Sequence, residues 1–182
     1  MKSELKLPSA AMLVIGNEIL SGRTHECNSF FLAGKLTEIG VHLLEIRIVP
    51  DLSDDIIFAT NELRAKHSYL FTSGGIGPTH DDITASSIAK AFKVEIGIRE
   101  DARIILENYY LKTNQKLNAP RLRMARIPEG AILIENSVSA APGFILSNVY
   151  VMAGVPKIFK AMVNSILPTL HGGKPILSVS VA

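Results

Sequence analysis

Short stretches of hydrophobic residues recur at regular distances in the first half of the chain. Residues 11–15 and 69–72 form apolar runs that each end at or next to small residues. Within residues 42–49, Leu44, Ile46 and Ile48 alternate with Glu45 and Arg47. Both patterns are typical of strands, the continuous run for a strand buried on both faces and the alternation for one that is half exposed.

Between these strands the apolar residues recur every three or four positions, as they do along one face of a helix. Helices are expected over residues 28–39, where Asn28 can serve as the cap, from Ser53 onward, and over residues 82–92. Strand and helix therefore alternate from residue 11 to residue 92. This order predicts a three-layer α/β/α fold, an α/β protein with a mostly parallel sheet covered by helices on both faces.

The second half of the chain is less regular. A helix is expected over residues 99–111, strands over 131–134, 144–146 and 149–152, and a last helix over 155–167 with Pro156 in its first turn. Residues 147–148 are expected to form a two-residue hairpin turn. We expect one domain over residues 1–172, and residues 173–182 to be either an edge strand of it or the start of a second domain.

Composition and charge narrow the class of protein. The 182 residues are 47% hydrophobic and 20% charged, which suits one globular domain. The net charge of +2 argues against nucleic acid as a partner, because such binding neutralises many phosphates. No apolar run approaches membrane-spanning length and no signal peptide is recognisable, so we expect no membrane partner and a cytoplasmic location. The single cysteine, Cys27, excludes an intrachain disulfide.

The strongest chemical signal is the glycine-rich segment that follows the strand at 69–72. Glycines let backbone N–H groups approach an anion closely, and a helix is expected directly afterwards, with its positive end toward the same place. The segment is neither a Walker A loop nor a dinucleotide fingerprint, and a tight strand-to-helix turn is the alternative. The predicted phosphate-binding residues are Thr72, Ser73, Gly74, Gly75, Gly77, Pro78 and Thr79.

Acidic residues follow three of the predicted strands. Glu18, Asp51 and Asp82 should meet at the carboxyl edge of a parallel sheet, where open α/β sheets bind ligands. Carboxylates beside a phosphate repel it unless a cation such as Mg²⁺ lies between them. We therefore predict a metal site of Asp82, Glu18 and Asp81, with charge compensation at a helix start as the alternative. Arg121, Arg123 and Arg126 are expected to be exposed, or to contact a ligand phosphate.

Residues 72–84 closely resemble the Thr-Thr-Gly-Gly-x-Gly-Pro-Thr-x-Asp-Asp-x-Thr signature of the molybdopterin-binding domain. That domain occurs in molybdenum-cofactor biosynthesis proteins, in gephyrin-like proteins and at the N-terminus of the CinA family. A related domain precedes the synthase part of some FAD synthases. The resemblance is closest to the CinA type and extends over four further segments, at residues 16–23, 49–51, 136–144 and 154–162.

The resemblance implies a ligand, a metal and two catalytic residues. The ligand is a phosphorylated pterin, namely molybdopterin, or a nucleotide, and a divalent cation such as Mg²⁺ accompanies it. Asp51 and Asp82 match aspartates implicated in nucleotidyl transfer or metal insertion. The chain departs from the family pattern at Asn17, usually Asp, at Ser139, usually Gly, and at Ile158–Phe159, usually Glu-Met. The last change removes a carboxylate and weakens the expectation of hydrolysis.

Three functions remain open at this stage. The first is binding of a phosphorylated pterin or nucleotide, in molybdenum-cofactor biosynthesis. The second is metal-dependent cleavage of the diphosphate of ADP-ribose or FAD, as the CinA resemblance implies. The third is a non-catalytic oligomerisation module. The resemblance further implies a homo-oligomer, a trimer first and a CinA-like dimer second.

Overall fold

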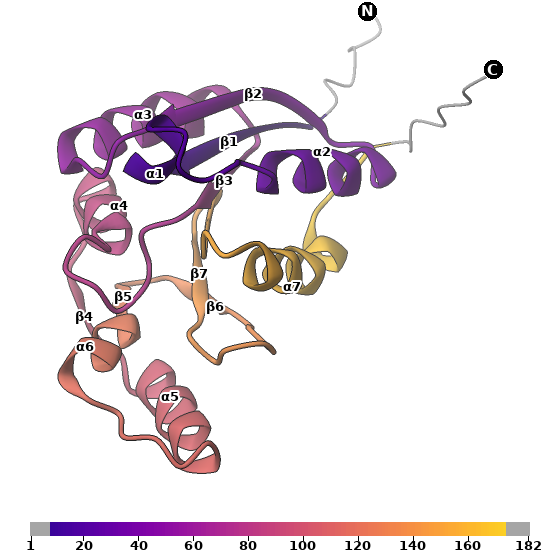
Figure 1. Ribbon diagram of the computed structural model, residues 1–182. Helices are drawn as coiled ribbons and strands as arrows, with labels where there is room; N and C mark the ends of the chain where they lie inside the picture. Colours follow the sequence, from indigo (N-terminus) through magenta and orange to yellow (C-terminus); the bar gives the residue numbers. More distant parts are fainter. Residues whose placement is uncertain (1–7, 174–182) are drawn as a thin grey trace, which may run out of the picture.

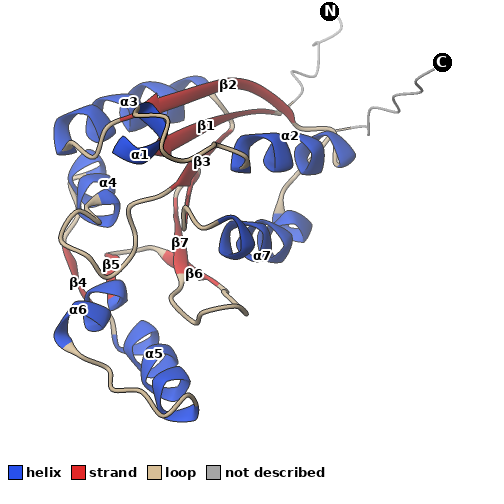
Figure 2. Cartoon of the chain, viewed as in Figure 1, coloured by secondary structure: helices blue, strands red, loops and turns tan. Residues whose placement is uncertain are grey.

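The computed structural model describes residues 8–173, and they form a three-layer α/β/α structure (Figures 1 and 2). Six strands form the central sheet in the order β2-β1-β3-β8-β7-β6. They are β1 (Ser9–Ile15), β2 (His42–Val49), β3 (Tyr69–Ser73), β6 (Ile132–Ile134), β7 (Gly143–Leu146) and β8 (Val149–Met152). Strands β2, β1, β3 and β8 are parallel. Strand β7 pairs antiparallel with β8, and β6 pairs antiparallel with β7. The predicted, mostly parallel fold is confirmed.

Helices cover both faces of the sheet, as Figure 2 shows. Leu32 and Leu36 of α2 (Asn28–Glu38) and Phe159 of α7 (Pro156–Ile166) pack against one face, in a cluster with Met12 and Phe71. On the other face, α3 (Ser53–Lys66) and α4 (Thr84–Phe92) pack against the alternate residues of the same strands. Because β1 and β3 are covered on both sides, they read as continuous apolar runs in the sequence.

Part of the second half of the chain projects from the sheet. It contains β4 (Ile96–Ile98), α5 (Glu100–Lys112), α6 (Ala119–Leu122) and β5 (Arg126–Pro128). In Figure 1, α5 and α6 extend downward from the three layers. Strands β4 and β5 form their own two-stranded antiparallel sheet.

The short elements are absent from the sequence prediction. These are β4, β5, α6, α1 (Asn17–Leu20) and the two 3₁₀ turns at Arg123–Ala125 and Leu167–Thr169. Strands β4 and β5 contain Gly97, Arg126 and Pro128, so they lack the apolar run that marks the equally short β6, β7 and β8, and their pairing joins residues about thirty positions apart. The prediction of Arg126 at an exposed edge is corrected, because Arg126 belongs to β5 and is half-buried.

One predicted helix start and one predicted helix cap are wrong, although α2 begins at Asn28 as expected, and each error has a local cause. Helix α4 begins at Thr84 and not at Asp82, because the Asp82 carboxylate folds back onto the Thr79 amide. Helix α2 is not capped by the Asn28 side chain. The Glu26 carboxylate accepts from the Asn28 amide at 2.7 Å, which leaves the Asn28 side chain free for a contact elsewhere.

The remaining predictions concern the end of the chain and the membrane. The predicted hairpin turn is confirmed, since Leu146 pairs with Val149 and Ser147 adopts a positive φ of 55°. The strand predicted within residues 173–182 lies, beyond Gly173, outside the described residues. None of the described helices combines the length and the apolar character needed to cross a membrane.

Candidate functional site

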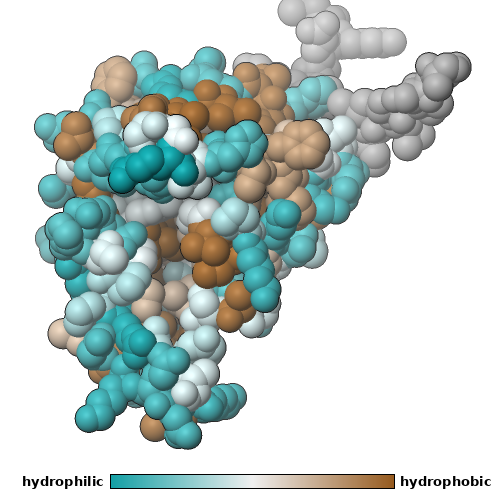
Figure 3. Space-filling model, in the orientation of Figure 1, coloured by the Kyte–Doolittle hydropathy of each residue, from teal (hydrophilic) through white to brown (hydrophobic). Residues whose placement is uncertain are grey.

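Two adjoining grooves lie at the carboxyl edge of the parallel strands, where the segments after β1, β2, β3 and β8 meet. The larger has a volume of about 600 Å³ and runs past the glycine-rich loop, and the smaller, of about 270 Å³, is acidic. Glu18, Gly75 and Asp82 line both grooves. The molecule is hollowed at the centre of the face seen in Figure 3. Parallel strands bring their carboxyl ends to one edge, so the predicted location follows from the fold.

Gly74 and Gly75 are required by the shape of the loop. Both have positive φ, 110° and 70°, a conformation that side chains disfavour. A Cβ at Gly74 would lie 2.1 Å from the Ile15 carbonyl oxygen, and one at Gly75 would lie 2.1 Å from Thr84 Oγ1. These glycines therefore allow the loop to pack tightly against β1 and the start of α4, while its outer side faces the groove.

The loop presents three consecutive unpaired backbone donors. Within the described residues, the N–H groups of Gly75, Ile76 and Gly77 form no hydrogen bond, whereas Gly74 N–H donates to the Met152 carbonyl oxygen. All three residues line the larger groove. Successive free amides in a turn of positive φ form a concave anion-binding surface.

The four predicted acidic residues line the smaller groove together. Glu18 lies in α1, Asp51 follows β2, and Asp81 and Asp82 lie in the loop before α4; the structure brings the four to one place as predicted. Asp51 Oδ2 accepts from the Asn17 amide at 2.8 Å. Asp82 Oδ2 accepts from the Thr79 amide at 2.8 Å and from its hydroxyl at 2.6 Å. One oxygen of each aspartate thus accepts hydrogen bonds from a neighbouring segment of the chain. The other oxygen of each remains available to a metal ion or a ligand.

The predicted metal site is not a preformed cage. Across residues 8–173, no three His, Cys, Asp or Glu side chains are arranged closely enough to hold a metal ion. Mg²⁺ is nevertheless held in many sites by one or two carboxylates together with the phosphates of the ligand. The free oxygens of Asp51 and Asp82 fit that mode of binding, and Glu18 lies at the junction of the two grooves.

Two of the predicted phosphate ligands are buried instead. Thr72 is fully buried in β3, so its hydroxyl cannot reach a ligand in either groove. Ser73 is buried too, and its Oγ accepts from Asn28 Nδ2 at 2.9 Å. Pro78 lines the larger groove and Thr79 the smaller one. His80 is exposed and lies 3.0 Å from Asp81. The phosphate-binding prediction therefore narrows to the loop from Gly74 onward.

The opposite wall of the larger groove comes from the projecting part of the chain. Tyr109 and Tyr110 lie near the end of α5, Gln115 follows this helix, and Met124 lies in the 3₁₀ turn at Arg123–Ala125. Nothing in the sequence pattern marks these residues, because they reach the groove only through tertiary packing. Asn136 and Ala141 also line it, and they belong to a segment in which the family resemblance is strong.

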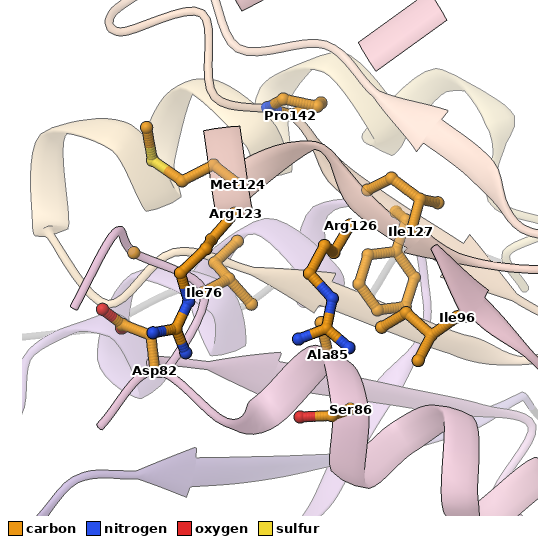
Figure 4. A pocket seen from close by; sticks show the side chains of 12 residues that line it. Ile76, Asp82, Ala85, Ser86, Ile96, Arg123, Met124, Arg126, Ile127 and Pro142 are labelled. Carbon is orange, nitrogen blue, oxygen red and sulfur yellow. The ribbon is translucent and has the colours of Figure 1, made fainter. Parts of the chain in front are cut away.

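Two arginines lie behind the loop. Arg123 and Arg126 line a small cavity of about 30 Å³ with Gly77, Asp82 and Ser86. Figure 4 shows the Arg123 side chain pointing toward Asp82 and the Arg126 side chain pointing toward Ser86. Neither forms an ion pair with another described residue. Their charge is therefore available next to the amides of the glycine loop.

Comparison with known proteins identifies the family to which the chain belongs. A family model described as "Probable molybdopterin binding domain" matches residues 11–172, nearly the whole described chain. The chain belongs to this family. A protein of Pyrobaculum calidifontis is 34% identical in an alignment 185 positions long, which covers 95% of this chain and 71% of that protein. A CinA-like protein of Desulfosudis oleivorans is 34% identical over 94% of this chain, but the match covers 43% of the relative.

Solved structures show the same fold for this molybdopterin-binding domain. The CinA protein of Thermoplasma acidophilum, whose function is unknown, superimposes with a TM-score of 0.81 and 33% identity, over 90% of this chain and 98% of that chain. The molybdopterin biosynthesis enzyme MoaB of Thermus thermophilus gives a TM-score of 0.59 at 13% identity, over 90% of this chain and 92% of that chain. The second likeness concerns the fold alone.

Proposed function

We propose that this domain binds a phosphorylated pterin or nucleotide in the larger groove, with a phosphate on the amides of Gly75, Ile76 and Gly77. Those three unpaired donors are the observation that carries the proposal. Unpaired N–H groups beside a groove favour an anion there, because a bound phosphate satisfies all of them together.

The rest of the groove suits the remainder of such a ligand. Its volume of about 600 Å³ falls within the ordinary range for small-molecule sites. Tyr109, Tyr110 and Ile158 provide apolar surface against which a ring system can pack. Arg123 and Arg126 add positive charge behind the loop, which offsets the repulsion between a phosphate and Asp82.

The family and its solved members favour a phosphorylated pterin over a nucleotide as the ligand. MoaB proteins with this fold are described as molybdopterin biosynthesis or tungsten-cofactor synthesizing proteins. We infer a place for this chain in molybdenum-cofactor biosynthesis as the leading role.

Metal-dependent cleavage of a diphosphate, with ADP-ribose or FAD as substrate, is the second candidate. The acidic groove that adjoins the phosphate loop favours it, because a divalent cation held by Asp51 and Asp82 would supply electrophilic assistance to a bound diphosphate. Water would add across the P–O–P bridge, and AMP would be one product. Release of AMP in the presence of Mg²⁺ or Co²⁺ separates this candidate from binding alone.

Substitution of Gly75 by valine tests the binding proposal. The valine would meet Thr84 Oγ1 and require a disfavoured φ, so the three amides would lose their alignment. Hydrogen bonds to charged groups contribute roughly 1.5–3 kcal/mol each, so we expect affinity to fall by at least about 100-fold. Calorimetry with ADP-ribose, FAD and a phosphorylated pterin measures the change, and mass spectrometry identifies any ligand that co-purifies.

Gly97→Val is the matched control, because a Cβ at Gly97 meets no atom within 4 Å. It should bind as the unmodified protein does. Circular dichroism establishes that both variants are folded. Equal affinities for the two folded variants would exclude the loop as the phosphate site. If no phosphorylated compound binds the unmodified protein, the non-catalytic oligomerisation module becomes the better description.

A further inference from the structure

Arg121 ties the loop after α5 to the far wall of the larger groove. This residue lies in α6, and Figure 1 shows the loop that joins α5 and α6 in the projecting part of the chain. Its Nη2 donates to Gln115 Oε1 at 2.7 Å, and its Nη1 donates to the Lys116 carbonyl oxygen at 2.7 Å. The guanidinium carbon lies 4.4 Å from the centre of the Tyr110 ring, a cation–π contact. Arg121 is therefore half-buried and held by three contacts within this part of the chain.

The contact with Arg121 fixes the orientation of the Gln115 amide. A glutamine amide has one acceptor, Oε1, and two N–H donors on Nε2, whereas a guanidinium only donates. Oε1 must therefore face Arg121, because Nε2 in that place would set N–H groups against N–H groups. In the described part of the chain, this is the only hydrogen bond of the Gln115 side chain, so both N–H groups of Nε2 are free.

Free donors distinguish Gln115 from the other amide side chain that lines the larger groove, Asn136. Nδ2 of Asn136 donates to Ser139 Oγ at 2.7 Å and to the Ala141 carbonyl oxygen at 2.9 Å. Its Oδ1 accepts from the backbone amides of Val138 and Ser139, at 3.0 and 3.2 Å. The Asn136 amide is thus used within its own loop, and Gln115 supplies the amide that can bind a ligand.

Two tyrosines stand beside Gln115 on the same wall. Tyr109 and Tyr110 lie near the end of α5, and both line the groove. Their ring centres are 5.4 Å apart and their planes meet at 83°, edge to face. The backbone N–H of Gln115 donates to the Tyr110 carbonyl oxygen at 2.9 Å, which keeps the glutamine next to the rings. Aromatic surface with a directed donor beside it suits a flat ring that carries an acceptor.

We propose that Gln115 Nε2 donates to an acceptor on the edge of the ligand's ring, either a carbonyl oxygen or a ring nitrogen, while the ring packs against Tyr109 and Tyr110. Arg121 is a positioning residue, because it holds the amide with its donors free. This inference rests on the proposed function, in which the phosphate lies on the glycine-rich loop of the same groove. It assigns to the ligand a heteroaromatic ring with an acceptor edge, a feature that pterins, flavins and purines share. A phosphorylated sugar without such a ring lacks this contact.

Gln115→Glu tests the donor. Glutamate has the same length and still offers an oxygen to Arg121, so the loop should keep its shape, but both N–H donors are replaced by an oxygen that only accepts. An acceptor would then face the acceptor of the ring, so we expect the affinity for ring-bearing ligands to fall by about 10- to 100-fold. Calorimetry with 6-hydroxymethylpterin phosphate, flavin mononucleotide and AMP measures this loss. The compound with the largest loss identifies the ring that this wall recognises.

Two controls separate the donor from the added charge. Ribose 5-phosphate has the phosphate but no heteroaromatic ring, so its affinity should be nearly the same for Gln115→Glu and for the unmodified protein. Asn108→Asp makes the same change from amide to carboxylate at an exposed position of α5, outside the lining of the groove. It should bind all four compounds as the unmodified protein does.

A double-mutant cycle tests the positioning role of Arg121. Arg121→Ala frees the Gln115 side chain, so it should weaken binding of the ring-bearing compounds and leave ribose 5-phosphate unchanged. Combined with Gln115→Ala, it should add little to the loss from Gln115→Ala alone, because both residues act through one hydrogen bond to the ring. A role in stability alone would lower the free energy of unfolding in urea without this selectivity between ligands. Additive losses would overturn the positioning role.

The ring contact is overturned if Gln115→Glu binds every ring-bearing compound as tightly as the unmodified protein does, or if Asn108→Asp causes the same loss. Equal affinity of the unmodified protein for ribose 5-phosphate and the ring-bearing compounds would also overturn it, because the ring would then contribute nothing. Failure of the proposed function gives different results. If none of the four compounds binds, both proposals are wrong. If Gly75→Val binds all four unchanged while Gln115→Glu loses affinity, the phosphate site is wrong and the ring contact stands.

Discussion

Asp82 has a structural role in the glycine-rich loop in addition to its proposed role in binding a metal ion. Its Oδ2 holds the Thr79 amide and hydroxyl, which closes the loop and delays the start of α4 to Thr84. A Cβ at Gly77 would lie 2.7 Å from the same oxygen, so the glycine leaves room for the carboxylate. The side chain nevertheless lines both grooves.

Replacement of Asp82 by asparagine is expected to separate these roles. Asparagine still offers an oxygen to the Thr79 amide, so the fold should persist. Without metal, a phosphorylated ligand should bind equally well or better, because a repelling charge is gone. Any turnover that depends on Mg²⁺ should fall by roughly 10²–10³, as for one lost catalytic contact. Calorimetry with and without EDTA and an assay of AMP release from ADP-ribose measure the two effects.

Asp51→Asn completes the comparison. If both aspartates serve one ion, the double variant should lose little more activity than either single variant, since effects on a shared partner are not additive. The metal site would be excluded if Asp82→Asn kept the metal dependence of the unmodified protein and if the activity losses of the two single variants added in the double variant. Asp82 would then have only its structural role in the loop.

At the scale of elements, charged side chains tie the edge strand β2 to α3. Glu45 Oε2 lies 2.6 Å from Lys66 Nζ, Glu45 Oε1 lies 2.7 Å from Arg47, and Arg47 lies 2.6 Å from Glu62. The hydrogen bonds from Lys66 and then Arg47 lower the pKa of Glu45 from 4.5 to about 2. The ionised carboxylate is therefore bound more favourably in the folded state than in the unfolded one.

This shift predicts how stability depends on pH. The contribution of Glu45 is fully present above pH 4.5, its unfolded pKa, and is lost as the pH falls toward 2. After allowance for the exposed Lys66, it amounts to roughly 1–2 kcal/mol at neutral pH. Urea denaturation should show Glu45→Gln less stable by this amount at pH 7 and nearly equal to the unmodified protein at pH 2. Glu38→Gln, in the exposed pair with Lys35, should change little at either pH.

At the scale of the whole molecule, Asn28 joins three segments that are far apart in the sequence. Its Nδ2 donates to Ser73 Oγ at 2.9 Å, at the end of β3, and to the Gly154 carbonyl oxygen at 2.8 Å, before α7. Asn28 is buried at the start of α2. These bonds hold together the loops at the carboxyl edge of the sheet, including one wall of the larger groove.

Asn28→Ala should therefore destabilise the fold and loosen the groove. A buried hydrogen bond to Ser73 and a part-buried one to Gly154 are lost and their acceptors are left unpaired, which costs about 2–3 kcal/mol. Urea denaturation measures this loss, and calorimetry should show weaker ligand binding in the folded variant. Asn118→Ala, which removes an exposed cap of α6, should cost no more than about 1 kcal/mol. A similar loss in both variants would contradict the bridging role.

The sequence by itself determined the order of the long elements and the edge of the sheet at which the two grooves lie. Runs such as 11–15 and 69–72 are buried on both faces, so their hydrophobicity alone identifies them as strands. Parallel strands share one carboxyl edge, which was enough to bring Glu18, Asp51 and Asp82 together in the prediction. The glycine motif identified the family because the tight packing around Gly74 and Gly75 admits no other residue.

The tertiary structure decided which polar groups face the groove and what forms its far wall. Thr72 and Gly75 stand three residues apart in one motif, yet one is buried in the sheet and the other lines the groove. Tyr109 and Tyr110 reach the site only because α5 projects beside it. Likewise, the alternation of β2 predicted a half-exposed strand, but only the strand order placed its apolar face at a free edge. Local patterns report which face of an element is apolar, whereas its neighbours depend on contacts between residues far apart in the chain.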